Sequence, residues 1–240
     1  MVSLITKVRP EGAIHETLRF AYEKRGALAY ISHLDVLRTM TKACLRAALP
    51  LYYSEGFSPH PKLSFAAPLP VGQESVCEHF DVRLCAPMSP DDAMAALNAT
   101  LPTGLTIKAA GYPACKFTEV AAADYEITLR TSGADAALCD ILTSLLSRKP
   151  LIVYKRSKAG DRDVDISPNI LGVRGELADG LIRLYVTLRA EGGAFLNTDY
   201  LISYLKGEAG ILSSDPLSES ASVMRLSLLD ADGNIFTEEQ

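Results

Sequence analysis

The sequence predicts an α+β protein made of two ferredoxin-like (split βαβ) units packed together. Segments with strand-like alternation and segments with helix-like periodicity follow one another in the order β-α-β-β-α-β. A similar order returns in the second half, without sequence identity between the halves. The chain has 240 residues, of which 48% are hydrophobic, enough for two small cores. We therefore expect a first unit over residues 1–112, a second over 122–230 and an acidic tail over 231–240.

The first unit begins with Leu18, Phe20 and Tyr22 on one side of an alternating strand. Ser32 can cap the helix that follows, and Pro50 ends it. In chain order, the expected strand, helix, strand, strand, helix and strand lie at residues 18–22, 33–49, 63–67, 80–84, 90–99 and 105–109.

The second unit shows its clearest alternation at residues 182–188, which can form a hairpin with 171–177 through Asp179-Gly180. The boundary between the units is expected within residues 111–123, and the tail after Asp230 is expected to fray. The other expected strands and helices of this unit lie at residues 125–129, 134–147, 151–154, 198–205 and 223–229.

Common cofactor motifs are missing from the sequence. The five cysteines have long, irregular spacings, and no C-x-x-C, phosphate-binding glycine loop or H-E-x-x-H occurs. We therefore expect no cofactor and no metal site. The amino-terminal residues lack a signal-peptide pattern, and no run approaches the ~18 apolar residues that span a bilayer. A cytoplasmic protein without membrane segments is expected.

Charge is distributed unevenly along the chain. The formal net charge is −5, yet Arg148 to Arg162 contains six basic residues and one acid. A loop with this composition suits contacts to phosphates, because lysine and arginine can follow a nucleic-acid backbone without reading bases. A solvated hairpin is the alternative. The candidate nucleic-acid-binding residues are Lys155, Arg156, Lys158 and Arg162.

A second group of polar residues surrounds the predicted start of the helix at His33 and the loop that follows the helix. Helix amides together with His33 could hold an anion, and His60 could transfer a proton. His33 and His60 are thus weak catalytic candidates; the alternative is that the group only caps the helix and shapes the loop. The candidate binding residues are Ser32, His33, Asp35, Tyr53, Ser54, Gly56, Phe57, Pro59 and His60.

His79 and Asp81 lie two residues apart on a predicted strand and therefore face the same side. Such a pair could supply two metal ligands. Pairing with an opposite charge on an exposed sheet face is the favoured interpretation.

Several fragments together resemble the radical-SAM-linked domain-of-unknown-function family. The specific parts are SHLD, YSEGFSPHPK, the LPVGQES…E…D stretch and KRSK…DVDI, and the resemblance extends from about Leu18 to about Leu205. Members of that family are fused to, or encoded beside, B12-binding radical-SAM proteins, often near ribonuclease and ribosomal-protein genes. The resemblance thus implies a radical-SAM partner and an RNA-related context, and it makes Asp165 a further candidate beside Lys155.

Three functions follow from these observations. The favoured one is a non-catalytic accessory protein of a radical-SAM enzyme that binds RNA (tRNA or rRNA) for modification. The alternatives are a protein-interaction subunit that binds no RNA and a metal-independent RNA-processing endonuclease with His33 or His60 as general base. If the units form one rigid body, the first motif and the basic loop could line one groove.

Overall fold

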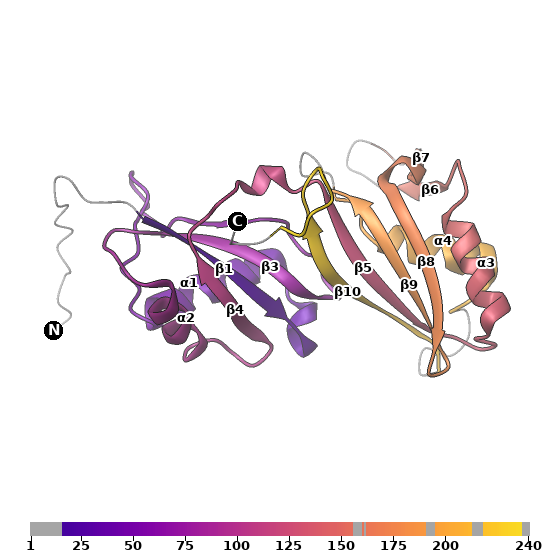
Figure 1. Cartoon of the computed structure of the whole chain (residues 1–240), viewed down its shortest axis with the longest axis horizontal. Coiled ribbons are helices and arrows are strands. Elements are labelled where there is room, and N and C mark those ends of the chain that lie inside the picture. The colour runs from indigo at the N-terminus through magenta and orange to yellow at the C-terminus, as the bar shows by residue number, and fades with distance from the viewer. Residues whose placement is uncertain (1–15, 156–159, 161, 191–194, 213–217, 237–240) are drawn as a thin grey trace.

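The computed structural model describes residues 16–155, 160, 162–190, 195–212 and 218–236. These residues form an elongated α+β molecule around one eight-stranded sheet (Figure 1). The strand order is β4-β1-β3-β10-β5-β9-β8, and the short β2 also pairs with β3. None of the helices described is both long and apolar enough to cross a bilayer.

The first unit has the strand order β4-β1-β3-β2, the arrangement expected of a ferredoxin-like βαββαβ unit. Its two helices begin where short polar side chains accept a backbone hydrogen bond, Ser32 before α1 and Ser89 before α2. The elements are β1 (Glu16–Lys24), α1 (His33–Arg46), β2 (Leu63–Phe65), β3 (Gln73–Leu84), α2 (Pro90–Asn98) and β4 (Leu105–Gly111).

The second unit repeats this arrangement with the order β10-β5-β9-β8. Its elements are β5 (Ala122–Arg130), α3 (Ala136–Leu146), β8 (Ile170–Ala178), β9 (Leu181–Arg189), α4 (Asp199–Ala209) and β10 (Ser220–Leu229). The prediction of two ferredoxin-like units is confirmed.

One strand expected in the second unit lies outside the main sheet. Residues 152–155 form β6 (Ile152–Lys155), which pairs only with β7 (Arg162–Asp165) in a separate two-stranded hairpin. The corresponding place in the main sheet is taken by β8. The hairpin is thus inserted between α3 and β8, at the end of the molecule far from α1 (Figure 1).

Each unit has its own hydrophobic core. In the first, Phe80 stacks between Phe20 and Phe65, with ring centroids 5.1 and 5.4 Å apart, beneath α1 and α2. In the second, alternate residues of β5 and β9, such as Ile127 and Leu184, are fully buried with Leu142 of α3. Alternation along the strands therefore places one face of the sheet against helices and leaves the other face without them.

Parallel pairing between β3 and β10 joins the two units. The pairing involves Val223 with Gln73, Met224 with Glu74, and Arg225 with Ser75. Beside it, Gln73 Nε2 donates to Thr198 Oγ1 at 2.8 Å, next to the start of α4. The contact is short, but it makes the sheet continuous across both units.

The segment after β10 differs from the frayed tail that the sequence predicts. Phe236 N donates to Leu228 O at 2.8 Å, and the Phe236 side chain is 5% exposed. Its ring packs against Phe117 of the linker and His79 of β3. The tail is therefore anchored as far as residue 236, because it carries an aromatic side chain that covers the helix-free face of the first unit.

Candidate functional site

The start of α1 holds three of the predicted binding residues. Ser32 Oγ accepts the Asp35 backbone hydrogen at 3.2 Å and donates to Asp35 Oδ2 at 2.7 Å. Arg38 also donates to Asp35 at 3.1 Å. These bonds from Ser32 and Arg38 lower the pKa of Asp35. Ser32 and Asp35 thus hydrogen-bond to each other and cap the start of α1.

His33 lies beside this cap but faces inward. Its half-buried ring meets the edge of Phe65 with centroids 5.2 Å apart. Burial lowers the pKa of His33, with a smaller contribution from the positive charge of Lys24. A neutral imidazole packed against a phenylalanine is suited to a structural role more than to proton transfer.

The loop after α1 is closed by Ser54 and His60. Ser54 N donates to His60 O at 2.8 Å, His60 N donates to Ser54 Oγ at 3.1 Å, and Ser54 Oγ lies 3.0 Å from His60 Nδ1. Gly56 adopts a φ of +121°, which favours glycine. Pro59 is exposed, Tyr53 is at the limit of exposure, and the Phe57 side chain is fully exposed. The loop therefore presents an aromatic tip.

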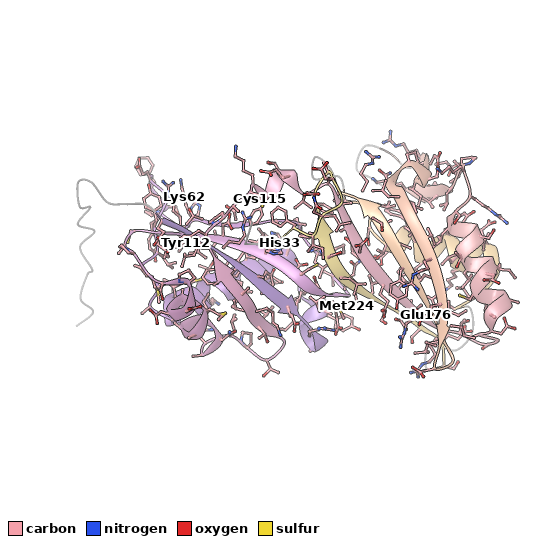
Figure 2. The ribbon with its side chains drawn as sticks, viewed as in Figure 1. His33, Lys62, Tyr112, Cys115, Glu176 and Met224 are labelled. Carbon is pink, nitrogen blue, oxygen red and sulfur yellow. The ribbon has the colours of Figure 1, made fainter. Side chains whose placement is uncertain are left out.

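The predicted site residues fall into separate places. His33 contacts Phe65 near the middle of the molecule, whereas Lys62, at the base of the loop, lies toward one end (Figure 2). The β6–β7 hairpin, which carries the predicted basic residues, lies at the other end (Figure 1). The motif of the first unit and the basic loop therefore do not line one groove.

The hairpin places two cations directly opposite each other. Lys155 on β6 pairs in register with Arg162 on β7, and both side chains are exposed. Arg156 and Lys158 lie outside the described residues. Asp165 accepts the backbone hydrogens of Leu151 and Ser167, each at 2.9 Å, and these bonds lower its pKa. Asp165 therefore closes the base of the hairpin.

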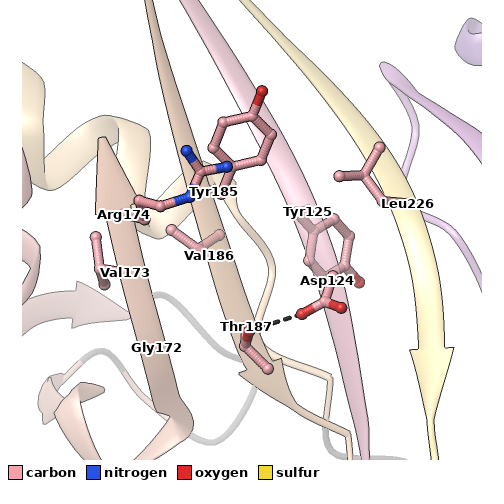
Figure 3. Close-up of a pocket in the computed structure, with 9 residues that line it drawn as sticks. All are labelled: Asp124, Tyr125, Gly172, Val173, Arg174, Tyr185, Val186, Thr187 and Leu226. Atoms are coloured by element: carbon pink, nitrogen blue, oxygen red, sulfur yellow. Dashed lines mark hydrogen bonds between the residues drawn. The ribbon is translucent and has the colours of Figure 1, made fainter. Parts of the chain in front are cut away.

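A hollow of about 440 Å³ lies on the helix-free face of the second unit (Figure 3). The Arg174 guanidinium stands 4.1 Å from the centroid of the Tyr185 ring. Asp124 accepts one hydrogen bond at each oxygen, from Thr187 Oγ1 and from Ser227 Oγ, both at 2.6 Å. Other lining residues are Tyr125, Gly172, Val173, Val186 and Leu226.

A second hollow, of about 190 Å³, adjoins the first. The two share Gly172 and Val173 on β8. Ser147, Arg148 and Lys149, which follow α3, line the far side. The first hollow lies on the open sheet face, and the second lies on the side of β8 that faces α3, so the two meet across this edge strand. We call the two hollows together the β8 groove, and sequence analysis missed its residues on the sheet because their polar positions look like any exposed strand face.

A buried charge cluster that the sequence did not predict lies where the units meet. Arg225 on β10 is 0% exposed and donates to Glu78 on β3, while Lys24, 1% exposed, donates to Ala29 O at 3.2 Å. Lys24, Glu78, Tyr22 and His33 line one small cavity. Arg225 Nη1 is a buried donor without a partner among the described residues. The signal was available, because Lys24 and Arg225 occupy inward-facing positions of alternating strands.

His79 and Asp81 have separate protein partners. Arg19 donates to both Asp81 oxygens, at 2.8 and 3.0 Å, and stands over the Phe117 ring at 4.2 Å. His79 Nδ1 lies 3.0 Å from Cys77 O. The opposite-charge pair expected at Asp81 is present, but on a covered face, since Arg19 is 1% exposed. In the part of the chain that the structure describes, no group of three or more metal-ligating side chains occurs.

Three solved structures are similar to this chain at low levels. A crystal structure of a Cbf5-Nop10-Gar1 complex shares 10% identity over 87% of this chain, with a TM-score of 0.45, and this chain spans 49% of that one. An unknown protein from Galdieria sulphuraria shares 11% identity over 88% of this chain and 99% of that chain, with a TM-score of 0.26. A putative glycine cleavage system transcriptional repressor has the same identity and coverage, with a TM-score of 0.23.

A search of curated proteins gave no match. A family match, in contrast, covers the first unit and the second unit as far as β9. It includes every lining residue of the β8 groove except Leu226. It extends over residues 17–196, and the chain therefore belongs to the family described as an uncharacterized protein conserved in bacteria (DUF2344).

Proposed function

We propose that the chain is a non-catalytic, cytoplasmic accessory protein that binds RNA on its second unit and presents it to a separate radical-SAM enzyme. The observation that carries the RNA part is the β8 groove, in which basic residues meet, across β8, a helix-free sheet face with an arginine–tyrosine pair. The enzyme part rests on the resemblance in the SHLD and YSEGFSPHPK motifs.

The hairpin beside the groove favours a polyanion. Like charges directly opposite each other on paired strands repel, and the described residues include no ion-pair partner for Lys155 or Arg162. A phosphate between the two side chains would relieve this repulsion. Lys149 extends the positive charge to the start of the groove, beside Arg148, which is paired with Glu208 at 3.6 Å. Phosphate contacts of this kind position a nucleic acid without reading its sequence.

The open face of the second unit suits unpaired bases. A base can stack on an aromatic ring or on a guanidinium plane, and the Arg174–Tyr185 pair offers both. Stacking contributes about 1–3 kcal/mol for each base and tolerates any sequence. Phosphates on the hairpin side and bases on the sheet side would place a single strand along the groove.

The separation of the two histidines supports a non-catalytic role. His33 packs against Phe65, and His60 is bonded within its own loop to Ser54. A general base and a second catalytic group need to converge on one point of a substrate. These two imidazoles have different surroundings and different partners.

The loop tip of the first unit is the proposed contact to the enzyme. Phe57 is fully exposed, and at the base of the loop Lys62 and Arg83 lie within 5.5 and 4.8 Å of the Tyr52 ring. An exposed aromatic side chain anchored on a closed loop is a common centre of protein interfaces. The tip and the β8 groove are on opposite units, so one chain could hold RNA and enzyme together.

RNA binding is tested by fluorescence anisotropy of labelled tRNA and single-stranded RNA over a salt series. Lys155→Glu combined with Arg162→Glu should weaken binding at low salt and reduce the slope of log K against log salt by about two. Lys42→Glu with Lys108→Glu makes the same charge change on exposed residues of the first unit and should leave binding unchanged. Absence of binding by the natural chain, or equal loss in both variants, would refute the RNA part.

The enzyme partnership is tested by mixing the chain with a purified B12-binding radical-SAM protein and measuring binding by calorimetry. We expect a complex that Phe57→Ser weakens by tenfold or more, as for a central interface aromatic. The Lys155→Glu, Arg162→Glu variant is the control and should bind the enzyme as the natural chain does. No complex, or a complex insensitive to Phe57, contradicts this part of the proposal.

A further inference from the structure

The larger hollow of the β8 groove has the features of a base pocket. It lies over four neighbouring strands, with Arg174 on β8, Tyr185 on β9, Asp124 on β5 and Leu226 on β10 around it (Figure 3). Its volume of about 440 Å³ is in the range of small-molecule sites. One side is a stacked cationic and aromatic pair, the opposite side is aliphatic, and a carboxylate lies between them.

The carboxylate of Asp124 is held in a fixed orientation. Thr187 donates to one oxygen and Ser227 to the other, each at 2.6 Å, from the strands on either side. An ionised carboxylate offers about four lone-pair sites. Each oxygen can therefore accept one further hydrogen bond, and the carboxylate lines the hollow. The carboxylate is therefore suited to a ligand with two adjacent hydrogen-bond donors.

Among the four RNA bases, guanine has two adjacent N–H donors on its Watson–Crick edge, N1–H and the N2 amino group. Adenine and cytosine place one amino group beside an acceptor, and uracil places one N–H between two acceptors. An arginine side chain of a protein would also offer paired donors. It would, however, bring a second guanidinium next to Arg174, which stands over Tyr185 in the same pocket.

We propose that the pocket binds an unpaired guanine, with Asp124 accepting its N1–H and N2 hydrogens and the Arg174–Tyr185 pair stacking on its plane. This inference rests on the proposed function and names the base that the RNA presents. Gly172 lines both hollows of the groove and has no side chain between them. The sugar–phosphate chain of the bound nucleotide passes over Gly172 toward Arg148 and Lys149.

The test uses labelled single-stranded RNA octamers of uridine with one central substitution, bound to the full chain and followed by anisotropy. The guanosine octamer should bind tenfold or more tighter than the adenosine, cytidine and all-uridine octamers, since two bonds to a charged acceptor are gained. Inosine keeps N1–H and lacks the N2 amino group, so its octamer should lose most of this preference. The inosine comparison uses only the natural chain and is independent of any effect of substitution on folding.

Two variants within the pocket and one control variant outside it assign the preference to its residues. Asp124→Asn should abolish the guanosine preference, because an amide cannot accept two hydrogens at one edge. Asp140→Asn, on the exposed face of α3, removes the same charge and should keep the preference. Tyr185→Leu should weaken all four octamers, since stacking does not depend on the base.

The outcomes separate this inference from the proposed function. Equal binding of all octamers, with the salt dependence of RNA binding intact, refutes the guanine pocket and leaves the RNA function standing. A guanosine preference that survives in Asp124→Asn also refutes it. Competition by guanosine monophosphate identifies the source of the base: Asp124-dependent binding of the free nucleotide without any RNA binding supports the pocket and refutes the RNA function.

Discussion

Arg225 on β10 and Glu78 on β3 form a buried ion pair that joins the two units. Arg225 Nε donates to Glu78 Oε1 at 2.9 Å, and Arg225 Nη2 donates to Glu78 and, at 2.7 Å, to Ala67 O. Arg225 is 0% exposed and Glu78 is 5% exposed. The pair lies beside the short parallel contact between β3 and β10, so removal of one partner leaves the other charge at the centre of the junction.

Glu78→Ala should therefore destabilise the protein strongly. The loss of stability should be about 3–5 kcal/mol, because the guanidinium of Arg225 would stay buried without an opposite charge. The free energy of unfolding from urea titration measures this. The double variant Glu78→Leu, Arg225→Met removes both charges and should recover part of the loss. A Glu78→Ala variant as stable as the natural chain would show that the pair is not a major element of the junction.

Phe236→Ala should also destabilise the protein, by about 3 kcal/mol, although the residue lies close to the end of the chain. Its buried ring packs against Phe117 and His79, with the Arg19 guanidinium 5.2 Å from its centroid. Ile235, its neighbour, is 66% exposed, and Ile235→Ala should change stability by less than about 0.5 kcal/mol. Thermal unfolding of both variants is the measurement; equal effects would mean that the tail does not cover the first unit.

Two glycines on β8 should respond differently to alanine. A Cβ at Gly175 would lie 2.2 Å from Thr143 Oγ1, which is held by a bond to Cys139 O, whereas a Cβ at Gly172 meets Thr187 Oγ1 at an ordinary 3.6 Å. Gly175→Ala should cost about 1–3 kcal/mol through overpacking between β8 and α3. Gly172→Ala should fold with little loss. Urea unfolding distinguishes the two, and equal stabilities would contradict the close approach of α3.

Stability should fall in mildly acidic solution through His33. Burial lowers the pKa of His33 in the folded protein, so the unfolded chain takes up a proton at a higher pH than the folded one. This loss of stability is absent well above the pKa of about 6.5 that histidine has in an unfolded chain. It grows as the pH falls from there toward the lowered pKa of His33 in the folded protein. Urea titrations from pH 8 to pH 5 give the free energy of unfolding at each pH. His33→Gln should reduce the dependence of this free energy on pH. His60→Gln, in the exposed loop, is the control and should retain it.

The repeated units could be predicted because their signals are local. Alternation marks the strands at 125–129 and 182–188, and a serine cap followed by an acid in the first turn marks α1 and α2. Residues 151–154 were also recognised as a strand. Their place in a separate hairpin was not, because strand propensity does not specify which neighbour a strand pairs with.

The candidate site was less predictable because it depends on contacts between distant residues. Ser32 and His60 occur in neighbouring motifs, but one caps a helix while the other closes a loop. Asp124, Arg174 and Tyr185 come from three strands and meet only when those strands align. Arg225 could have been noticed as a charge in an inward-facing position, although its partner on β3 could not be identified from alternation alone.

The short parallel contact between β3 and β10 has a consequence for any attempt to divide the protein. Without the second unit, residues 73–75 of β3 would lose their neighbour on the β10 side, because β2 covers only residues 80–82 of that edge. Without the first unit, β10 would present an uncovered backbone edge with Arg225 exposed beside it. Unpaired strand edges recruit other chains. Each half would thus be prone to aggregation, and the fusion of the two units protects both from it.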